Sequence, residues 1–345
     1  MKPNSKPTRS VCNAFLLCAF IVLAAISLVA YAQPGISAKG GQLDTIRVAY
    51  NPGTVLRLYA AFERDTFTKY GLKIDLIRFE SGAAASAAFA AGSVDVGFTG
   101  IPGFIASRLA GANTKVFMVE NDSGGAEGLV ARPQSKIASV RDLSGKRVGT
   151  VVGTTSWMGL ISALQKSDID AASVKIENVP PSAWIPAFQR GDVNALFIWS
   201  PILFTIVDSG GTLVSTMSEY RLDPLLWQGR SDFLSTKADL ARRFVLALEE
   251  AQPEVAARDE KFLARMAKET ASSRSATLKT VEAIKAVPIA DQVSATSPYS
   301  LTAPHGLSAQ IDDWLKLYLE KGIFRQRPNL QNALDPAPIQ AALRR

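Results

Sequence analysis

The sequence predicts an α/β fold built as two similar lobes, and three observations carry this prediction. Short apolar runs alternate with helical runs between residues 46 and 208, an order that favours parallel sheets covered by helices. Residues 89–96 and 188–195 repeat one pattern of helix, glycine and strand, each followed by a turn that contains proline. The chain of 345 residues is also long enough for two domains with sizeable cores. We therefore expect two lobes whose strand-exit loops converge on one cleft.

The first 32 residues have the layout of a secretory signal peptide. Lys2, Lys6 and Arg9 precede an apolar run at 14–30, and Ala-Tyr-Ala at 30–32 forms a cleavage site. An uncleaved membrane anchor is the alternative, but the apolar run is short for a span. We expect residues 1–32 to be removed on export.

The composition excludes several kinds of site. Cys12 and Cys18 both lie in the leader, so the mature chain has no disulfide, thiolate metal site or cysteine nucleophile. His305 has no second histidine or cysteine as a partner, which excludes a zinc site of the usual ligands. The mature chain carries 35 basic and 31 acidic side chains, interspersed along its length, for a net charge of +4. This balance predicts no nucleic-acid partner, because nucleic-acid binding needs a clustered basic face.

Elements of the first segment follow from apolar periodicity and from glycine positions. In chain order we expect a strand at 46–50, a helix at 56–70, a strand at 72–79, a helix at 82–91, a strand at 94–98 and a helix at 104–110. The loop between the last two elements, Thr99 to Gly103, turns the chain sharply. Ligands bind at such strand ends, and a following helix N-terminus offers N–H groups to an anion. An ordinary turn without a ligand is the alternative.

The second segment repeats this alternation before the chain becomes helical. We expect strands at 115–120, 127–132, 146–151, 174–179, 193–198, 212–215 and 225–229, with a helical turn at 139–143 and helices at 157–166, 181–190 and up to residue 208. The strand at 127–132 leaves the first domain. Further on, Ser235 is a candidate N-cap, a helix at 307–321 ends at Gly322, and a short helix follows Asp335.

The order and spacing of five segments resemble the substrate-binding proteins of ABC importers, in the nitrate/sulfonate/taurine (thiamine-pyrimidine-precursor-like) group. These segments are the Pro-Gly exit of the first strand, Gly-Ser-Val-Asp-Val-Gly-Phe, Asp-Leu-Ser-Gly-Lys-Arg-Val-Gly, Gly-Thr-Thr-Ser, and the run from Gly-Asp-Val-Asn-Ala to Trp-Ser-Pro, at 52–53, 92–98, 142–149, 153–156 and 191–201. The resemblance implies a periplasmic-binding-protein type II fold with a two-strand hinge. Lobe 1 would comprise 33–124 and 225–345, and lobe 2 would comprise 125–224.

The resemblance also implies a function and a set of contacts. The protein would be a periplasmic monomer, without a cofactor and without enzyme activity, that closes over a small anion such as a sulfonate or nitrate and delivers it to an ABC permease. Matching positions that would line the cleft are Asn51, Ser81, Gly100, Ile101, Thr154, Thr155 and Trp199. Trp227 would pack the apolar part of the ligand or belong to the core.

The sequence leaves the charge of the ligand and the class of protein open. Glu80 is either solvated or selects against anions, and the Trp199-Ser200-Pro201 turn lacks the acid that some amine-binding relatives place there, which disfavours an amine such as taurine. An exported enzyme of the same fold, a binder of a neutral pyrimidine-like solute and a sensory module are the alternatives. Neither a phosphate-binding loop nor a Gly-x-Ser-x-Gly elbow is present in the sequence.

Overall fold

The computed structural model describes residues 42–344. The predicted signal peptide at 1–32, with Cys12 and Cys18, lies outside the described residues, as does the lead-in up to residue 41. Within the described part, no helix combines the length and the apolar character needed to cross a membrane.

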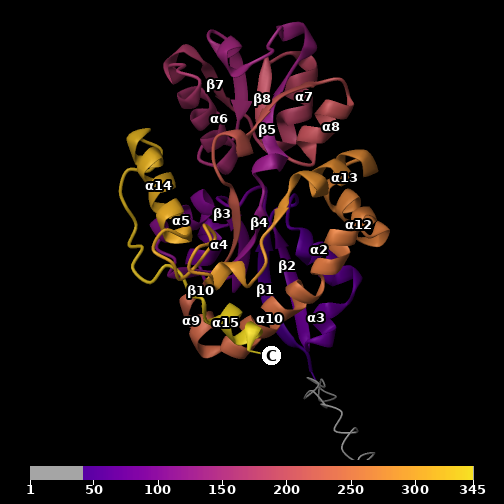
Figure 1. The fold of residues 1–345 in the computed structure, drawn as a ribbon, viewed down its shortest axis with the longest axis vertical. Coiled ribbons are helices and arrows are strands. Elements are labelled where there is room, and N and C mark those ends of the chain that lie inside the picture. Colours follow the sequence, from indigo (N-terminus) through magenta and orange to yellow (C-terminus); the bar gives the residue numbers. More distant parts are fainter. Residues whose placement is uncertain (1–41, 345) are drawn as a thin grey trace, which may run out of the picture. The chain divides into compact units, whose positions relative to one another are not determined.

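Two β-sheets form the framework (Figure 1). One sheet is six-stranded with the order β11-β4-β10-β3-β1-β2, and the other is five-stranded with the order β7-β6-β8-β5-β9. The first contains β1 (Asp44–Tyr50), β2 (Leu72–Arg78), β3 (Val96–Gly100), β4 (Thr114–Asp122), β10 (Pro224–Arg230) and β11 (Lys285–Ala286). The second contains β5 (Glu127–Ala131), β6 (Arg147–Thr150), β7 (Lys175–Asn178), β8 (Ala195–Trp199) and β9 (Thr212–Thr216). The predicted α/β class is confirmed.

The two sheets share one strand plan. In the first, β2, β1 and β3 are parallel neighbours and β10 runs antiparallel to β3. In the second, β7, β6 and β8 are parallel neighbours and β5 runs antiparallel to β8. The expected parallel sheet is therefore confirmed for three strands of each sheet, while the next strand, β10 or β5, makes both sheets mixed.

The helices cover both faces of the sheets, as alternating strands and helices require. Their bounds are α2 (Leu56–Glu63), α3 (Thr66–Lys69), α4 (Ser86–Ala90), α5 (Ile101–Leu109), α6 (Thr155–Lys166), α7 (Trp184–Arg190), α8 (Ile202–Asp208), α9 (Ser231–Thr236), α10 (Ala238–Glu250), α11 (Gln252–Ala257), α12 (Glu260–Thr270), α13 (Arg274–Ala283), α14 (Leu307–Glu320) and α15 (Ala337–Leu343). Helices α2, α3, α10 and α12 pack together, whereas α4, α5 and α14 form a separate group (Figure 1).

Several element boundaries differ from the sequence prediction. The helix expected at 56–70 is two helices, because Asp65 adopts a left-handed conformation between them. The helix expected at 82–91 is α-helical only over Ser86–Ala90. The strand expected at 94–98 begins and ends two residues later, so α5 starts directly after Gly100. Ser235 lies inside α9, and α10 has Lys237 at its N-cap position instead.

The predicted internal repeat is visible in matching hydrogen bonds at the amino-terminal ends of both sheets. The Arg47 backbone N–H donates to the Asp95 carboxylate at 2.9 Å, and the Asp95 N–H donates back to the Arg47 carbonyl. Arg147 and Asn194 make the same reciprocal pair, with the Arg147 N–H donating to the Asn194 side-chain oxygen at 2.9 Å. A glycine with positive φ lies three residues before the second member of each pair, at Gly92 before Asp95 and at Gly191 before Asn194.

The described chain passes between the sheets twice. It first runs from β4 to β5 through a short 3-10 helix, η1 (Gly124–Ala126), and it returns from β9 to β10 through another, η6 (Met217–Glu219). The two 3-10 helices contact each other. The crossing segments therefore form one compact junction.

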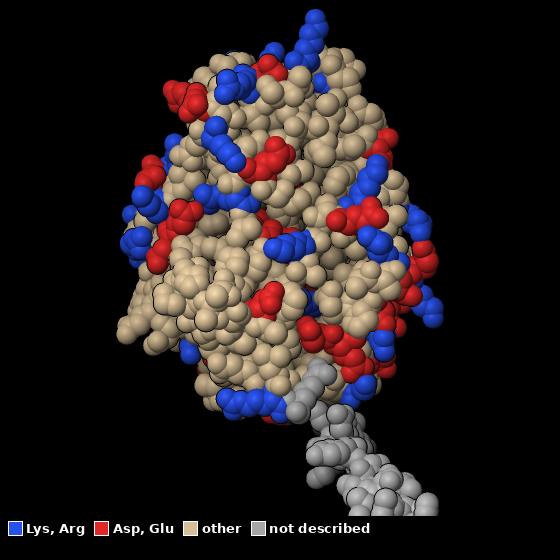
Figure 2. Space-filling model, in the orientation of Figure 1, with Lys and Arg blue, Asp and Glu red and all other residues tan. Residues whose placement is uncertain are grey.

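Charged side chains of both signs are interspersed on the face shown in Figure 2. Many of them form surface pairs between neighbouring elements, such as Lys69 with Glu250 at 2.6 Å and Arg265 with Glu63 at 3.0 Å. The visible face thus has no extended basic surface of the kind that binds nucleic acid.

Candidate functional site

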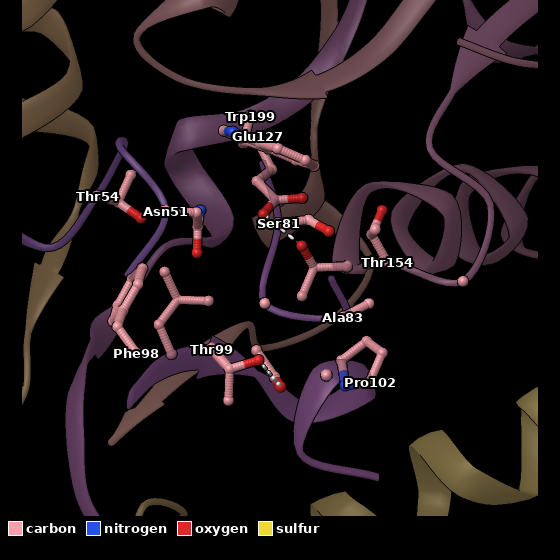
Figure 3. Close-up of a pocket in the computed structure, with 16 residues that line it drawn as sticks. Asn51, Thr54, Ser81, Ala83, Phe98, Thr99, Pro102, Glu127, Thr154 and Trp199 are labelled. Atoms are coloured by element: carbon pink, nitrogen blue, oxygen red, sulfur yellow. Dashed lines mark hydrogen bonds between the residues drawn. The ribbon is translucent and has the colours of Figure 1, made fainter. Parts of the chain in front are cut away.

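A small pocket lies where residues from both sheets meet (Figure 3). Its volume is about 40 Å³, which is room for about three water molecules. The residues that line it are Asn51, Thr54, Ser81, Gly82, Ala83, Phe98, Thr99, Gly100, Pro102, Gly103, Glu127, Gly153, Thr154, Thr155, Trp199 and Leu225. Most of them follow the carboxyl ends of strands, where open α/β sheets bind ligands.

The six-stranded sheet contributes the start of α5 to this pocket. Gly100 ends β3 and is the N-cap of α5, and Pro102 occupies the first turn, where its missing N–H costs no helical hydrogen bond. Gly103 and Gly82 must be small, because a Cβ on either residue would lie 2.1 Å from the hydroxyl oxygen of Thr99. The backbones of these segments can therefore approach a bound group closely.

The five-stranded sheet contributes the start of α6. Thr154 is the N-cap of this twelve-residue helix, so the N–H groups of its first turn have no intrahelical partner. These N–H groups and the helix dipole favour an anion at this end. A Cβ built on Gly100 would lie 2.5 Å from the Cγ2 atom of Thr155. The last residue of β3 and the first residue of α6 therefore lie in direct contact across the pocket.

Glu127 is a buried acid in the pocket wall. It is the first residue of β5, and its carboxylate accepts hydrogen bonds from the hydroxyls of Thr155 at 2.6 Å and Ser156 at 2.8 Å. Burial raises the pKa of Glu127 to about 7, although the two hydroxyl bonds oppose the rise. In the view of Figure 3 the side chain lies between Trp199 and Ser81.

The sequence prediction missed Glu127. The signal was available, since a single acid opens an otherwise apolar strand at 127–131. Strand β5 places the Glu127 carboxylate beside the start of α6, which begins 28 residues later in the chain, and no local signal in the sequence indicates this contact. Glu127 places an acid in the pocket wall, although the Trp199-Ser200-Pro201 turn, whose lack of an acid disfavoured an amine, has none.

Six of the eight predicted contact residues line the pocket: Asn51, Ser81, Gly100, Thr154, Thr155 and Trp199. The Trp199 ring packs edge-on against Trp184 with ring centroids 4.5 Å apart, which fixes its position in the wall. Contact between these six residues and a solute stays a prediction.

The other two predicted residues, Ile101 and Trp227, do not line the pocket. The Ile101 side chain is fully buried in the core, so this residue can contribute only through its backbone at the start of α5. Trp227 is fully buried between Phe98 and Phe244, and its indole N–H donates to the Glu120 carboxylate at 2.7 Å. Trp227 therefore belongs to the core, the alternative role considered for it.

A second cavity of about 240 Å³ adjoins the pocket, with Trp199 lining both. Arg78, Glu80 and Thr270 contribute polar groups to it, and Phe79 and Pro201 contribute apolar surface. Glu80 is exposed there, so it lies outside the inner pocket.

Helix α14 holds the start of α6 from behind. The Tyr318 hydroxyl donates to the Thr154 carbonyl oxygen at 2.6 Å, and the Tyr318 ring lies 5.2 Å from that of Trp157. The backbone that carries the free N–H groups of α6 is thus fixed by a residue more than 160 positions later in the chain.

Comparisons with known proteins identify sequences that are similar to this chain. A sequence model of the NMT1/THI5-like family matches residues 54–261. The taurine-binding periplasmic protein of Escherichia coli (strain K12) is 26% identical over 239 residues, which is 68% of this chain and 72% of that protein.

Solved structures show the same fold. The alkanesulfonate-binding protein SsuA from Xanthomonas axonopodis pv. citri, bound to MOPS, has a TM-score of 0.70 at 18% identity, over 86% of this chain and 99% of that chain. The desulfurization enzyme DSZB has a TM-score of 0.64 at 16% identity, over 87% and 99% of the two chains. The predicted periplasmic-binding-protein fold is confirmed, and this fold also carries an enzyme.

Proposed function

Because the chain belongs to the NMT1/THI5-like family, we propose that it is the extracytoplasmic solute-binding component of an ABC importer for a small sulfonate. The observation that carries this proposal is the pocket at which the N-terminal ends of α5 and α6 meet. A sulfonate group presents three acceptor oxygens and one negative charge, which matches free backbone N–H groups and helix dipoles. The names of the relatives similar to this chain, taurine-binding and alkanesulfonate-binding, support the same class of solute.

Glu127 narrows the solute class to a sulfonate that also carries an ammonium group. The Thr155 and Ser156 hydroxyls both use their protons on Glu127, so at this wall they present acceptors to a ligand. A buried carboxylate beside the pocket repels a plain anion and attracts a cation. A short aminosulfonate such as taurine matches both features of the pocket. Its sulfonate would lie at the helix N-termini, and its ammonium group would pair with the Glu127 carboxylate.

We propose binding without chemical conversion. The fold itself does not decide this, because it is shared with a desulfurization enzyme. The support comes from the mature sequence, which offers no cysteine and only His305 as a histidine. His305 does not line the pocket.

The remaining parts of the proposal concern organisation and partners. Lobe 1 comprises 33–124 and 225–345, lobe 2 comprises 125–224, and the junction of the two crossings is the hinge. The mature protein is a periplasmic monomer that closes over its solute and docks on a membrane permease. The six-stranded and five-stranded sheets, joined by two crossings, support this division.

Isothermal titration calorimetry with taurine and with ethanesulfonate tests the proposed function. We expect both to bind to the purified mature protein, with taurine the tighter ligand. In the Glu127→Gln variant, taurine affinity should fall about 100-fold because the ammonium loses its buried charge partner, whereas ethanesulfonate should bind at least as well as before.

The exposed Glu177 on β7 provides a matched control, since Glu177→Gln should change neither affinity. Thermal unfolding of each variant checks that it is folded, and mass spectrometry of the solute after incubation checks that it is unaltered. Absence of binding by both sulfonates, or formation of a product, would overturn the proposal.

A further inference from the structure

Three buried carboxyl groups meet at the junction of the two crossings. Asp122 ends β4, Glu127 begins β5 and Asp223 immediately precedes β10. Their exposed fractions are 6%, 2% and 0%. Burying three carboxylates together is unfavourable unless donors, cations or protons compensate their charges.

Hydrogen-bond donors satisfy Asp122. The Tyr299 hydroxyl donates to one of its oxygens at 2.6 Å, and the backbone N–H groups of Gly124 and Asp223 donate to the other at 3.0 Å and 3.3 Å. The amine of Lys285 lies 5.4 Å from the centroid of the Tyr299 ring. Fixed donors therefore meet the hydrogen-bonding capacity of both Asp122 oxygens.

Asp223 lacks such donors. Among the described residues, no N–H or O–H group of another side chain or backbone donates to either of its oxygens. The carboxyl group of Glu127 is the neighbour that acts on it most directly, because both its charge and side-chain hydrogen bonding to it raise the pKa of Asp223. Two carboxyl groups can form this bond only when one of them carries a proton.

The surrounding charges favour protonation of Asp223. Burial raises its pKa well above the usual range, and the negative charges of Glu127 and Asp122 add to the rise, whereas the Arg221 guanidinium opposes it. The Arg221 charge is shared with Asp313 at 3.2 Å, and Tyr318 is the further titratable neighbour, on α14. The pair thus holds one proton strongly and a second one near neutral pH.

We propose that Glu127 and Asp223 form a proton-sharing pair that determines which solutes the pocket accepts, so that binding of a plain anion takes up a proton and binding of a zwitterion does not. This inference rests on the proposed function. With one proton the pair carries one negative charge at the pocket wall, and an incoming sulfonate without an ammonium group draws a second proton from solvent onto Glu127. The ammonium of an aminosulfonate neutralises the same charge directly. Asp223 does not line the pocket, so it is a positioning residue that acts through Glu127.

Calorimetry at pH 8 in buffers of different ionisation enthalpy measures this proton directly. We expect ethanesulfonate to take up more than about half a proton per molecule bound, and taurine to take up almost none. Ethanesulfonate affinity should fall up to about tenfold for each pH unit above 7, whereas taurine affinity should change little. Equal uptake for both solutes, or ethanesulfonate binding without uptake, would overturn the proposal.

The Asp223→Asn variant separates the pair from ordinary structural support. Its amide can donate to Glu127 as the protonated Asp223 does, so proton uptake and ethanesulfonate affinity at pH 6 should both stay within about twofold of the wild type, whereas Asp223→Leu removes the donor, raises the Glu127 pKa further and should reduce proton uptake at pH 8. Asp192→Asn, at a half-exposed surface pair with Arg190, is the control that should leave proton uptake unchanged. Loss of proton uptake in a folded Asp223→Asn protein, or unchanged uptake in a folded Asp223→Leu protein, would contradict the assignment.

A measurement without solute distinguishes failure of this inference from failure of the proposed function. Folding raises the pKa of these groups. Their contribution to the free energy of unfolding is therefore complete below the unfolded-state pKa, and it is lost as the pH rises through the folded-state pKa. The unfolding temperature of the wild type should therefore fall relative to that of Asp223→Asn between pH 5 and pH 8. Parallel curves would reject the pair even if sulfonates bind, and diverging curves without sulfonate binding would reject only the solute assignment.

Discussion

The two sheets are alike at the ends remote from the pocket and differ at the ends that face it. At the remote ends, Arg47 with Asp95 and Arg147 with Asn194 make the same reciprocal hydrogen bonds. At the pocket, the start of α5 presents Gly100, Pro102 and Gly103, whereas α6 begins with two residues whose hydroxyls donate to Glu127. A shared plan thus fixes where the two helix ends meet, and the residues that differ decide what can bind between them.

The largest expected effect comes from making the α5 side bulkier. Gly100→Ala should weaken solute binding about 100-fold, because the new Cβ would lie 2.5 Å from the Cγ2 of Thr155 and must push the two helix starts apart. The backbone of Gly100 has φ of −86°, so alanine itself is compatible with the local conformation. Calorimetric titration with taurine measures the loss.

A second substitution shows whether this contact is the cause. Thr155→Ser removes the Cγ2 atom and keeps the hydroxyl that donates to Glu127. The Gly100→Ala/Thr155→Ser double variant should therefore regain affinity to within about tenfold of the wild type. If the double variant binds no better than Gly100→Ala, the two helix starts do not restrain each other in the way described.

An intermediate effect is expected from the two tryptophans that were both predicted to contact the solute. Trp199→Phe should weaken taurine binding about fivefold to tenfold, since Trp199 forms pocket wall, and should change stability little. Trp227→Phe should leave affinity unchanged and lower the free energy of unfolding by about 2 kcal/mol, because it removes the donor to the buried Glu120. Urea unfolding and titration of both variants check this contrast, and the reverse pattern would exchange their roles.

The smallest effect should come from the remote ends. Asp95→Asn makes the first sheet resemble the second there and should cost about 1 kcal/mol at pH 7, through loss of the charged bonds from Arg47 at 2.7 Å and 3.0 Å. Burial alone would raise the pKa of Asp95, but hydrogen bonds from Arg47 outweigh it and lower the pKa below its usual value. Its stabilising contribution is therefore present above the unfolded-state pKa and is lost as the pH falls.

Urea unfolding at pH 7 and pH 3 tests this expectation, since the difference between wild type and Asp95→Asn should shrink at the lower pH. Asn194→Asp is the reciprocal control in the second sheet. The Arg147 side chain donates there to the Gly191 carbonyl at 2.9 Å, so we expect a change below about 0.5 kcal/mol. A constant difference across this pH range would show that the Asp95 charge contributes nothing.

The repeat and most strands could be predicted because apolar periodicity and glycine positions are local signals. Boundaries near the pocket could not, since tertiary contacts decide them. The strand before α5 extends to Gly100, and Thr99 within it packs against Gly82, which comes from the segment before α4. Pro102, taken as part of a turn, fits the first turn of a helix equally well.

The acidic part of the pocket depends on contacts between distant segments. Glu127 meets residues of α6, and Asp223 reaches the same point from 96 positions further along the chain. No periodicity or motif relates these positions. Trp227 was ambiguous for the same reason, because its burial against Phe244 depends on a helix later in the chain.

The hydrogen bond from Tyr318 to the Thr154 carbonyl has a mechanical consequence. Any outward swing of α6 must either carry α14 with it or rupture that bond, since α14 belongs to the C-terminal part of the chain while α6 belongs to the middle. Under the proposed division into two lobes, this bond therefore links the C-terminal part of lobe 1 to lobe 2. If the lobes close over a solute as proposed, the rate of its release should depend on this bond as well as on the residues that contact the solute.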